Sequence, residues 1–259
     1  MAVIGDTELL ELWEHSLGLD PAARALRLAA AVDPPRTPGE LAGMPLGARD
    51  ARLLELRAGL AGRQLAATAR CPRCDEEVEF EVDAAALAAL GPAGADAGEA
   101  ERALNVDGTR ITWRCPTSAD LAAVALLGDP VAAEAELLSR CVLAVEQDGP
   151  GGPGPADDPR GPAALLDASA RAALCSAMDE ADPLAELLVT LDCPGCGEVF
   201  AAELDAAEAA WSELNAAATR LLWEVDALAR AYGWTEADVL ALSPHRRRTY
   251  LQMAVGTDG

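Results

Sequence analysis

Two short cysteine motifs are the residues of this sequence whose types and spacing predict specific chemistry. Cys71-Pro-Arg-Cys74 and Cys193-Pro-Gly-Cys196 each separate two thiols by two residues. Thiolates at this spacing on a tight turn can bind one metal ion together, with Zn–S distances of about 2.3 Å. Two such turns supply the four sulfurs of a closed tetrahedral site. The sequence therefore predicts one structural Zn²⁺ per chain, bound by Cys71, Cys74, Cys193 and Cys196.

The residues around the two motifs have the local features of metal-binding turns. Proline follows the first cysteine, and the residue after the second cysteine is Asp75 in one motif and Gly197 in the other, both of which tolerate a positive φ. Alternating acidic and apolar residues come next, EEVEFEVD in the first case and GEVFAAELD in the second, and this alternation predicts a half-buried strand. We therefore expect a small zinc-ribbon-like β module, interrupted along the chain, from residues 71–83 and 191–205.

Other interpretations of the cysteine pairs stay open on the sequence alone. The motifs are separated by 118 residues, which is far longer than the usual spacing within a zinc ribbon. Two separate metal sites, a thiol-redox role and the absence of metal are the alternatives. A thioredoxin-like motif opens a helix in a βαβ unit, whereas strands are predicted here. The matching contexts favour one shared site, and a closed four-thiolate site has no open position for catalysis.

The remaining cysteines and the two histidines predict no second site. Cys141 and Cys175 lie in apolar stretches expected to be helical and are interpreted as small buried hydrophobes. Cys115, at a predicted strand end, is not favoured as a ligand. His15 and His245 have no metal-binding or triad-like context. Carboxylates are too numerous to single out a catalytic pair, so we expect no catalytic residues and no enzymatic activity.

Composition and charge exclude several classes of function. The chain of 259 residues has 20 basic residues, all of them arginine, against 43 acidic ones, for a formal charge of −23. Nucleic acids and anionic membranes would repel such a surface on average, and aromatic residues, at 3%, are too few for a base-stacking platform. The N-terminal stretch lacks the pattern of a signal peptide, and no stretch reaches the ~18 apolar residues of a membrane span. We expect a cytoplasmic protein that does not insert into membranes.

The elements that must position the cysteines are mostly helical. Apolar residues at three- and four-residue steps predict helices over residues 7–15, 21–32, 48–67, 118–127, 130–146, 163–177 and 206–231, followed by two short helices. Asp107-Gly108 predicts a β-hairpin. Glycine and proline predict a loop over 33–47, a flexible excursion over 90–100 and a flexible linker over 147–162. The expected fold class is α+β and mostly α-helical, with an N-terminal helical segment (1–46), a body that contains the interrupted ribbon (47–254) and a tail (255–259).

A basic cluster near the end of the sequence lies close to two aromatic residues. The cluster is Arg246, Arg247 and Arg248, and the aromatic residues are Trp234 and Tyr250. The favoured interpretation is a solvated helix face that pairs with the acidic body. The alternative is a patch that binds a partner protein.

Three segments together resemble a known family. They are GARDARLLELRAGLAGRQLAATARCPRC with the strand after it, RCPTSADLAAVA, and WEVDALARAYGWTEADVLALSPHRRRTYL. The chain is similar, over most of residues 45–254, to the baseplate hub assembly chaperones of contractile phage tails and of related bacterial contractile injection systems. The resemblance implies a non-enzymatic assembly chaperone or a structural baseplate component, with baseplate, hub or tube proteins as partners. The linker and the excursion depart from the family pattern, and zinc is expected from the cysteine spacing alone.

Two other functions use the same cysteine pairs. A zinc-ribbon regulator would contact nucleic acid or the transcription machinery, but the ribbon strands carry acidic residues where a basic surface is needed. A thiol-redox protein would need a thiol of low pKa close to a cation, and Arg73 is the only basic residue within either motif. A small-molecule substrate is not expected.

Overall fold

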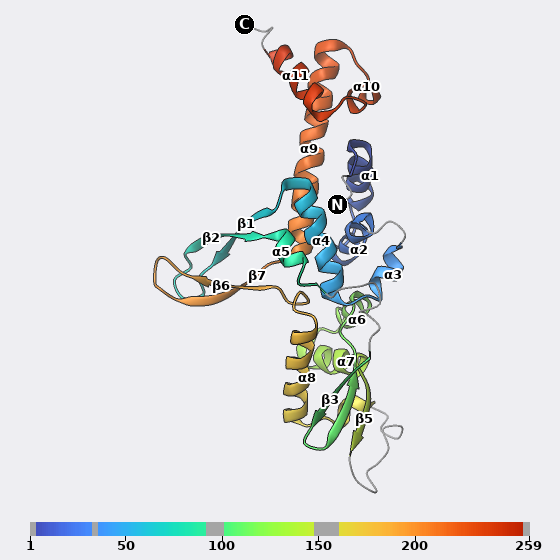
Figure 1. The fold of residues 1–259 in the computed structure, drawn as a ribbon, viewed down its shortest axis with the longest axis vertical. Helices are drawn as coiled ribbons and strands as arrows, with labels where there is room; N and C mark the ends of the chain where they lie inside the picture. Colours follow the sequence, from blue (N-terminus) through green and yellow to red (C-terminus); the bar gives the residue numbers. More distant parts are fainter. Residues whose placement is uncertain (1–3, 33–35, 92–100, 148–160, 256–259) are drawn as a thin grey trace.

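The computed structural model describes residues 4–32, 36–91, 101–147 and 161–255, and its fold is α+β with a preponderance of helix (Figure 1). Of the predicted linker over 147–162, residues 148–160 lie outside the described part. So do residues 92–100 of the predicted excursion and 256–259 of the predicted tail. Figure 1 shows a long helical body, an arm of two hairpins that projects from its side, and a separate group of strands and helices at one end.

A single apolar core holds the helical body together. Its helices are α1 (Asp6–Ser16), α2 (Pro21–Val32), α3 (Pro38–Ala42), α4 (Leu46–Ala61), α5 (Ala84–Ala88) and α9 (Ala206–Tyr232). Leu28, Leu41, Leu53 and Leu214 are completely buried in this core. The described part of the predicted N-terminal segment therefore packs in one core with the first half of α9, because each helix buries one apolar stripe against the others.

Helix α9 is the longest element, and its sequence explains both of its ends. Asp205 caps the first turn by accepting hydrogen bonds from the backbone N–H groups of Ala207 and Glu208. Gly233 ends the helix in a left-handed conformation with φ +70°. The spacing of apolar residues predicts this helix, and Leu214, Ala218, Leu221, Val225 and Leu228 are buried. Trp211 and Leu222, which share that spacing, are half-buried, and Tyr232 is exposed.

The projecting arm consists of two antiparallel hairpins, each with two strands. The first pairs β1 (Gln64–Arg70) with β2 (Glu77–Asp83), and the second pairs β6 (Leu188–Asp192) with β7 (Val199–Glu203). No backbone pairing joins the two hairpins in the described part of the chain. Their inner faces instead form a small apolar cluster that includes Val78, Phe80, Leu191, Phe200 and Ala202.

Aspartates at the base of the arm link both hairpins to the body. Asp83 ends β2 and caps α5, and Asp205 follows β7 and caps α9. The buried side chain of Arg57, in α4, donates to the carbonyl oxygens of Gly62 and Gln64 and forms an ion pair with Glu213 of α9. Arg57 therefore positions the start of β1 against α4 and α9 of the body.

The chain between the hairpins forms an insertion with its own core. Its elements are β3 (Arg102–Val106), β4 (Thr109–Trp113), α6 (Ser118–Val124), α7 (Pro130–Cys141), β5 (Val142–Gln147), a 3-10 turn η1 (Pro162–Leu165) and α8 (Ala168–Ala181). The sheet has the order β3-β4-β5. Ile111, Trp113, Val142 and Leu174 are buried at its centre. The predicted hairpin turn is confirmed, since Asp107 and Gly108 both have positive φ.

The insertion joins the body through buried polar contacts. The backbone N–H of Gly47, at the start of α4, donates to Oδ2 of Asp182 at 3.0 Å, and Leu46 N–H donates to the carbonyl of Pro116. Asp182 is 2% exposed and its Oδ1 has no hydrogen-bond partner. Burial raises the pKa of the Asp182 carboxyl above its ordinary value.

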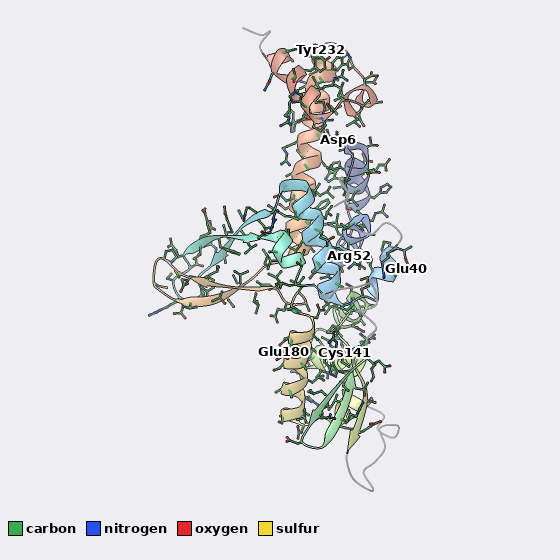
Figure 2. All side chains as sticks on the ribbon, viewed as in Figure 1. Asp6, Glu40, Arg52, Cys141, Glu180 and Tyr232 are labelled. Atoms are coloured by element: carbon green, nitrogen blue, oxygen red, sulfur yellow. The ribbon has the colours of Figure 1, made fainter. Side chains whose placement is uncertain are left out.

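Beyond α9, the chain folds back in α10 (Glu236–Leu240) and α11 (Pro244–Val255). These helices pack on the last turns of α9 around Leu228 and Val239, both completely buried. Figure 2 shows Tyr232 at this end of the molecule, opposite the insertion that carries Cys141.

Four elements predicted from the sequence have wrong bounds or types, and one of them is the helix predicted over 163–177, which is divided into η1 and α8 and ends at Ala181. The helix predicted over 48–67 ends at Ala61, and β1 follows it. The helix predicted over 130–146 ends at Cys141, and β5 follows it directly. The loop predicted over 33–47 contains α3, which begins with a Thr37–Glu40 capping box. For the helices predicted over 48–67 and 130–146, pairing with a neighbouring strand overrides the local helical tendency.

Candidate metal centre

Each cysteine motif forms the turn at the tip of one hairpin. In the first turn, Cys71 N–H donates to the carbonyl of Glu76 and Asp75 N–H donates to the carbonyl of Cys71, both at 2.9 Å. In the second, Cys193 N–H donates to the Glu198 carbonyl at 2.8 Å and Gly197 N–H to the Cys193 carbonyl at 2.9 Å. The two turns thus have the same hydrogen-bond pattern.

The residue after each second cysteine has the backbone conformation predicted from the sequence. Asp75 has φ 59° and Gly197 has φ 71°, both in the left-handed region. Glycine adopts this region at no steric cost, and aspartate adopts it more readily than most residues. Both turns therefore have a residue that suits their geometry.

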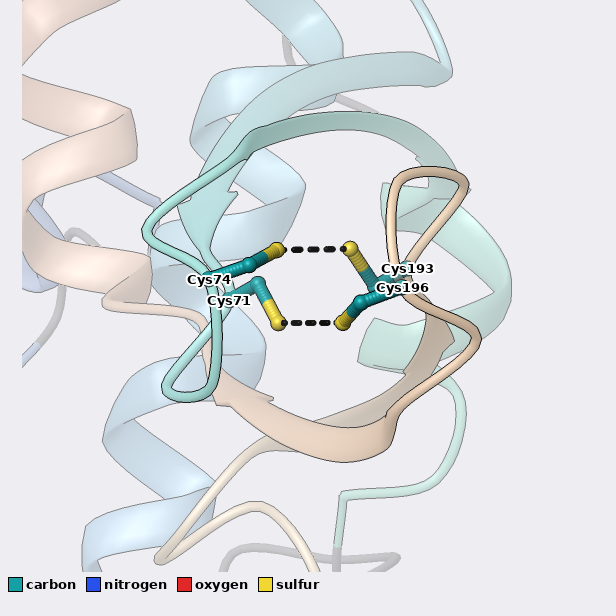
Figure 3. Close-up of side chains that lie close together, drawn as sticks. All are labelled: Cys71, Cys74, Cys193 and Cys196. Carbon is teal, nitrogen blue, oxygen red and sulfur yellow. Dashed lines mark hydrogen bonds between the residues drawn. The ribbon is translucent and has the colours of Figure 1, made fainter.

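The two turns bring all four predicted ligands together. Every pair among the four sulfurs of Cys71, Cys74, Cys193 and Cys196 lies within 4.8 Å (Figure 3). The sulfurs of Cys71 and Cys196 are 3.6 Å apart, as are those of Cys74 and Cys193. A tetrahedron with Zn–S distances of about 2.3 Å has edges of about 3.8 Å, so this spacing is close to that of a four-thiolate metal site. The predicted juxtaposition of the two motifs is confirmed.

The sulfurs differ in their exposure to solvent. Cys71 and Cys193, the first residue of each motif, are both 2% exposed. Cys74 is exposed and Cys196 is half-buried. Cys71 and Cys193 belong to the apolar cluster between the hairpins and Cys196 packs against it, whereas Cys74 does not. Each turn therefore contributes one buried and one more exposed cysteine.

Hydrogen bonds within the cluster separate the acidities of the thiols. Burial opposes ionisation of Cys71, but hydrogen bonds from the backbone of Arg73 and Cys74 and from the thiols of Cys193 and Cys196 outweigh it and lower the pKa of Cys71 to about 7. A backbone hydrogen bond from Glu76 favours the Cys74 thiolate, yet the neighbouring thiols and burial raise its pKa to about 12. One sulfur thus ionises readily, and its negative charge opposes ionisation of the next.

Contacts between the hairpin tips support the approach of the two turns. Arg73 and Glu198 form an ion pair across the tips, with 3.4 Å between the guanidinium and the carboxylate. Gly195 lies close to both turns, since a Cβ built on it would be 3.8 Å from the sulfurs of Cys193 and Cys74. The exposed face of β2 carries Glu77, Glu79 and Glu81, so this face of the first hairpin is acidic.

The donor set restricts the kind of ion that the centre can hold. Four thiolate sulfurs in a tetrahedral arrangement are suited to Zn²⁺ or iron and poorly suited to Ca²⁺ or Mg²⁺, which prefer oxygen. Among the described residues, these four cysteines are the only group of three or more potential ligands close enough to share an ion. All four positions of such a site come from protein, so the arrangement is typical of a structural centre.

The other three cysteines lie apart from this centre. Cys115 and Cys141 are 4% and 1% exposed, in the insertion, and burial raises the pKa of Cys141 to about 12. The interpretation of Cys175 as a buried hydrophobe is wrong, because it is exposed. The buried positions of α8 are Ala170 and Leu174, and Cys175 follows Leu174, so its side chain points away from the buried face.

The basic and aromatic residues near the C-terminal end form two different environments. Arg247 is 4% exposed and forms ion pairs with Asp6 of α1 and Glu224 of α9, whereas Arg246 and Arg248 are exposed. The favoured interpretation of a solvated face is therefore wrong at Arg247, which is buried, although its pairing with acidic residues of the body is present. The sequence pattern did not single out Asp6 as its partner, since the two residues are 241 positions apart.

Trp234 and Tyr250 belong to a compact aromatic group with Tyr232. The ring centroids of Tyr232 and Trp234 are 4.7 Å apart in a stacked arrangement, and Tyr250 packs edge-on against both. The Tyr232 hydroxyl donates to the carbonyl oxygen of Tyr250. The group joins the end of α9 to α11 and has a packing role within the chain.

Comparisons of the chain with protein-family models, with curated proteins and with solved structures found no match. None of the helices in the described part of the chain is long and apolar enough to span a membrane.

Proposed function

We propose that the four-cysteine centre binds one structural Zn²⁺ per chain. The observation that carries this proposal is the convergence of four sulfurs, all within 4.8 Å, from two motifs that are separated by 118 residues in sequence. Because no backbone pairing joins the hairpins, their association depends on the small apolar cluster, the Arg73–Glu198 ion pair and the sulfurs. A shared metal ion would link the two hairpins directly, so its binding free energy would contribute to the free energy of folding.

Metal content after purification without added metal tests this proposal. We expect one zinc per chain in the wild-type protein and a loss of that zinc in Cys74→Ser and Cys196→Ser, with a lower thermal midpoint. Cys175→Ser is the matched control, because that thiol is exposed and lies outside the cluster. A wild-type protein without zinc, or serine variants that retain a full equivalent and full stability, would contradict the shared site.

We further propose that the protein is a non-enzymatic assembly factor or structural component of the baseplate of a contractile, phage-tail-like particle. The resemblance of three segments to baseplate hub assembly chaperones supports this role. The projecting acidic arm supports it independently, because a surface of this charge can cover a basic face of a partner subunit and be displaced when that subunit assembles. The same acidic face disfavours a ribbon that contacts nucleic acid.

Affinity purification of the tagged protein from its native host tests the assembly role. We expect baseplate, hub or tube subunits to be retained, and we expect deletion of the gene to reduce the number of complete particles. A variant in which Glu77, Glu79 and Glu81 are changed to glutamine should retain zinc but lose part of this retention. Intact particles at normal abundance after gene deletion would refute the assembly role and leave the metal proposal untouched.

A further inference from the structure

We propose that hydroperoxides oxidise the four-cysteine centre to two disulfides that link the hairpins to each other, Cys71–Cys196 and Cys74–Cys193. The two covalent links replace the metal ion and keep the arm closed after the ion is released. This inference builds on the proposed zinc site, but its pairing follows from the positions of the sulfurs and applies to the metal-free protein as well.

The distances favour pairing between the hairpins. Two sulfur pairs in contact at 3.6 Å, Cys71–Cys196 and Cys74–Cys193, each join one hairpin to the other (Figure 3). Within a motif, the two cysteines belong to a turn fixed by backbone hydrogen bonds to Cys71 and Cys193. A disulfide between the hairpins needs only a further approach of two tips that have no backbone pairing to break.

Solvent exposure selects between the two possible pairings across the hairpins. Cys74 is exposed and Cys196 is half-buried, whereas Cys71 and Cys193 are buried. In the proposed pairing, each disulfide joins one of the more exposed cysteines to one of the buried ones. A hydroperoxide reaches the more exposed cysteine first, and the buried neighbour, whose sulfur is 3.6 Å away, then resolves the product. The other pairing across the hairpins would join the two more exposed cysteines and leave the two buried ones to react with each other.

The chemistry balances with a hydroperoxide as the only oxidant. The more exposed cysteine attacks the peroxide as a thiolate, after losing its proton to solvent where it is not already ionised. The O–O bond breaks, and a sulfenic acid and hydroxide (or an alkoxide) form. The neighbouring thiolate then attacks the sulfenic sulfur, which forms the S–S bond and expels a second hydroxide. Each disulfide thus consumes two thiolates and one hydroperoxide, with two electrons passing from sulfur to oxygen. Two hydroperoxides convert the centre completely, and the four cysteines, as neutral disulfides, would then no longer hold a divalent ion.

The pairing determines whether the arm survives oxidation. Disulfides within each motif would close four-residue loops and leave the hairpins free to separate. Disulfides between the hairpins close loops of more than a hundred residues, which restrict the unfolded chain far more strongly. The same four residues therefore hold the arm closed with metal under reducing conditions and with disulfides under oxidising ones.

Peptide mapping of the full-length protein tests the pairing. The purified protein, with its zinc content measured first, is treated with hydrogen peroxide, its free thiols are alkylated, and it is digested with trypsin without reduction. Cleavage after Arg70 and Arg73 separates Cys71 (peptide 71–73) from Cys74 (peptide 74–102), whereas Cys193 and Cys196 stay in peptide 172–220. We expect both cysteine peptides of the first motif to be linked to 172–220, and fragmentation at Pro194-Gly195 to assign Cys71 to Cys196.

Each alternative product has a different mass or fragment pattern. A link between peptides 71–73 and 74–102, the opposite assignment across the hairpins, or sulfinic acids in place of disulfides would each overturn the proposal. Cys115, Cys141 and Cys175 should be recovered as alkylated thiols. The same digest of chelator-treated protein separates this inference from the metal proposal, since the pairing should be unchanged even if the purified protein holds no zinc.

Discussion

Replacing Gly47 with alanine tests the joint between the body and the insertion. The residue lies in the first turn of α4, where its N–H donates to the buried carboxylate of Asp182. A Cβ at this position would lie 1.8 Å from Oδ1 of Asp182, 2.8 Å from its Cγ and 3.0 Å from the Cβ of Leu184. These contacts are far inside van der Waals separation, and both neighbours are buried. The aspartate must therefore move, and the hydrogen bond from Gly47 is lost with that movement.

The magnitude follows from three contributions. Overpacking of a well-packed site costs about 1–3 kcal/mol. Loss of the hydrogen bond to a buried carboxylate that already has one unpartnered oxygen costs about 1–3 kcal/mol more. Alanine is favoured over glycine within a helix by about 0.5–1 kcal/mol, which opposes the other two. We expect Gly47→Ala to lower the free energy of unfolding by about 3 kcal/mol.

Urea denaturation followed by circular dichroism measures this change. Gly39→Ala is the matched control, because its Cβ would lie in the short helix α3 with only Thr37 Oγ1 nearby, at 3.9 Å, and we expect it to be neutral or slightly stabilising. Combining Gly47→Ala with Asp182→Ala removes the closest clash, so the two losses should be less than additive. A loss below 1 kcal/mol for Gly47→Ala, or strict additivity in the double variant, would refute this account of the joint.

Three further predictions address the other buried contacts. Arg247→Ala should lower the free energy of unfolding by about 2–3 kcal/mol, since it leaves two partly buried carboxylates unpaired, whereas exposed Arg246→Ala should change it by less than about 0.5 kcal/mol in the same denaturation assay. Asp120→Asn should cost about 2 kcal/mol at pH 7. Burial opposes ionisation of Asp120, but its ion pair with an arginine and its capping hydrogen bonds hold its pKa below the ordinary value. The difference in unfolding free energy between Asp120→Asn and the wild type should therefore shrink as pH falls through that native pKa. A difference that does not change with pH would contradict this account. Leu214→Ala should cost about 3–5 kcal/mol through the cavity it leaves in the core, and exposed Leu126→Ala should have almost no effect on the urea midpoint.

The strand that precedes the first cysteine turn shows why sequence reasoning found only half of that hairpin. The strand after the first turn alternates glutamate with Val78, Phe80 and Val82, a pattern that only a strand explains. The strand before it, QLAATAR, has alanine on both faces, so its alternation is hidden and its composition favours helix. It is a strand because Leu65 and Ala69 pair opposite Val82 and Val78. The pairing that makes this segment a strand is determined by the partner strand β2 and not by the sequence of the segment itself.

A similar ambiguity hides β5. Val142 and Val145 are three residues apart, and they continue the apolar spacing of α7 as well as they fit a strand. Pairing with β4 places both valines in the core of the insertion. By contrast, the four ligands were predictable individually, because a CxxC turn is a local feature. That the two turns meet depends on how the intervening chain returns to the body, which local patterns do not encode.

The division of the four-sulfur centre between distant hairpins sets the order in which a newly made chain can mature. While the ribosome adds the insertion, only the first two sulfurs exist, and a pair of thiolates binds a metal ion far more weakly than four. The insertion has its own core and can collapse in the meantime, which brings the ends of a long loop closer and lowers the entropic cost of the final encounter. We therefore expect stable metal binding only after synthesis has passed Cys196. A metal-bound centre would then indicate a chain in which the two hairpins have already come together.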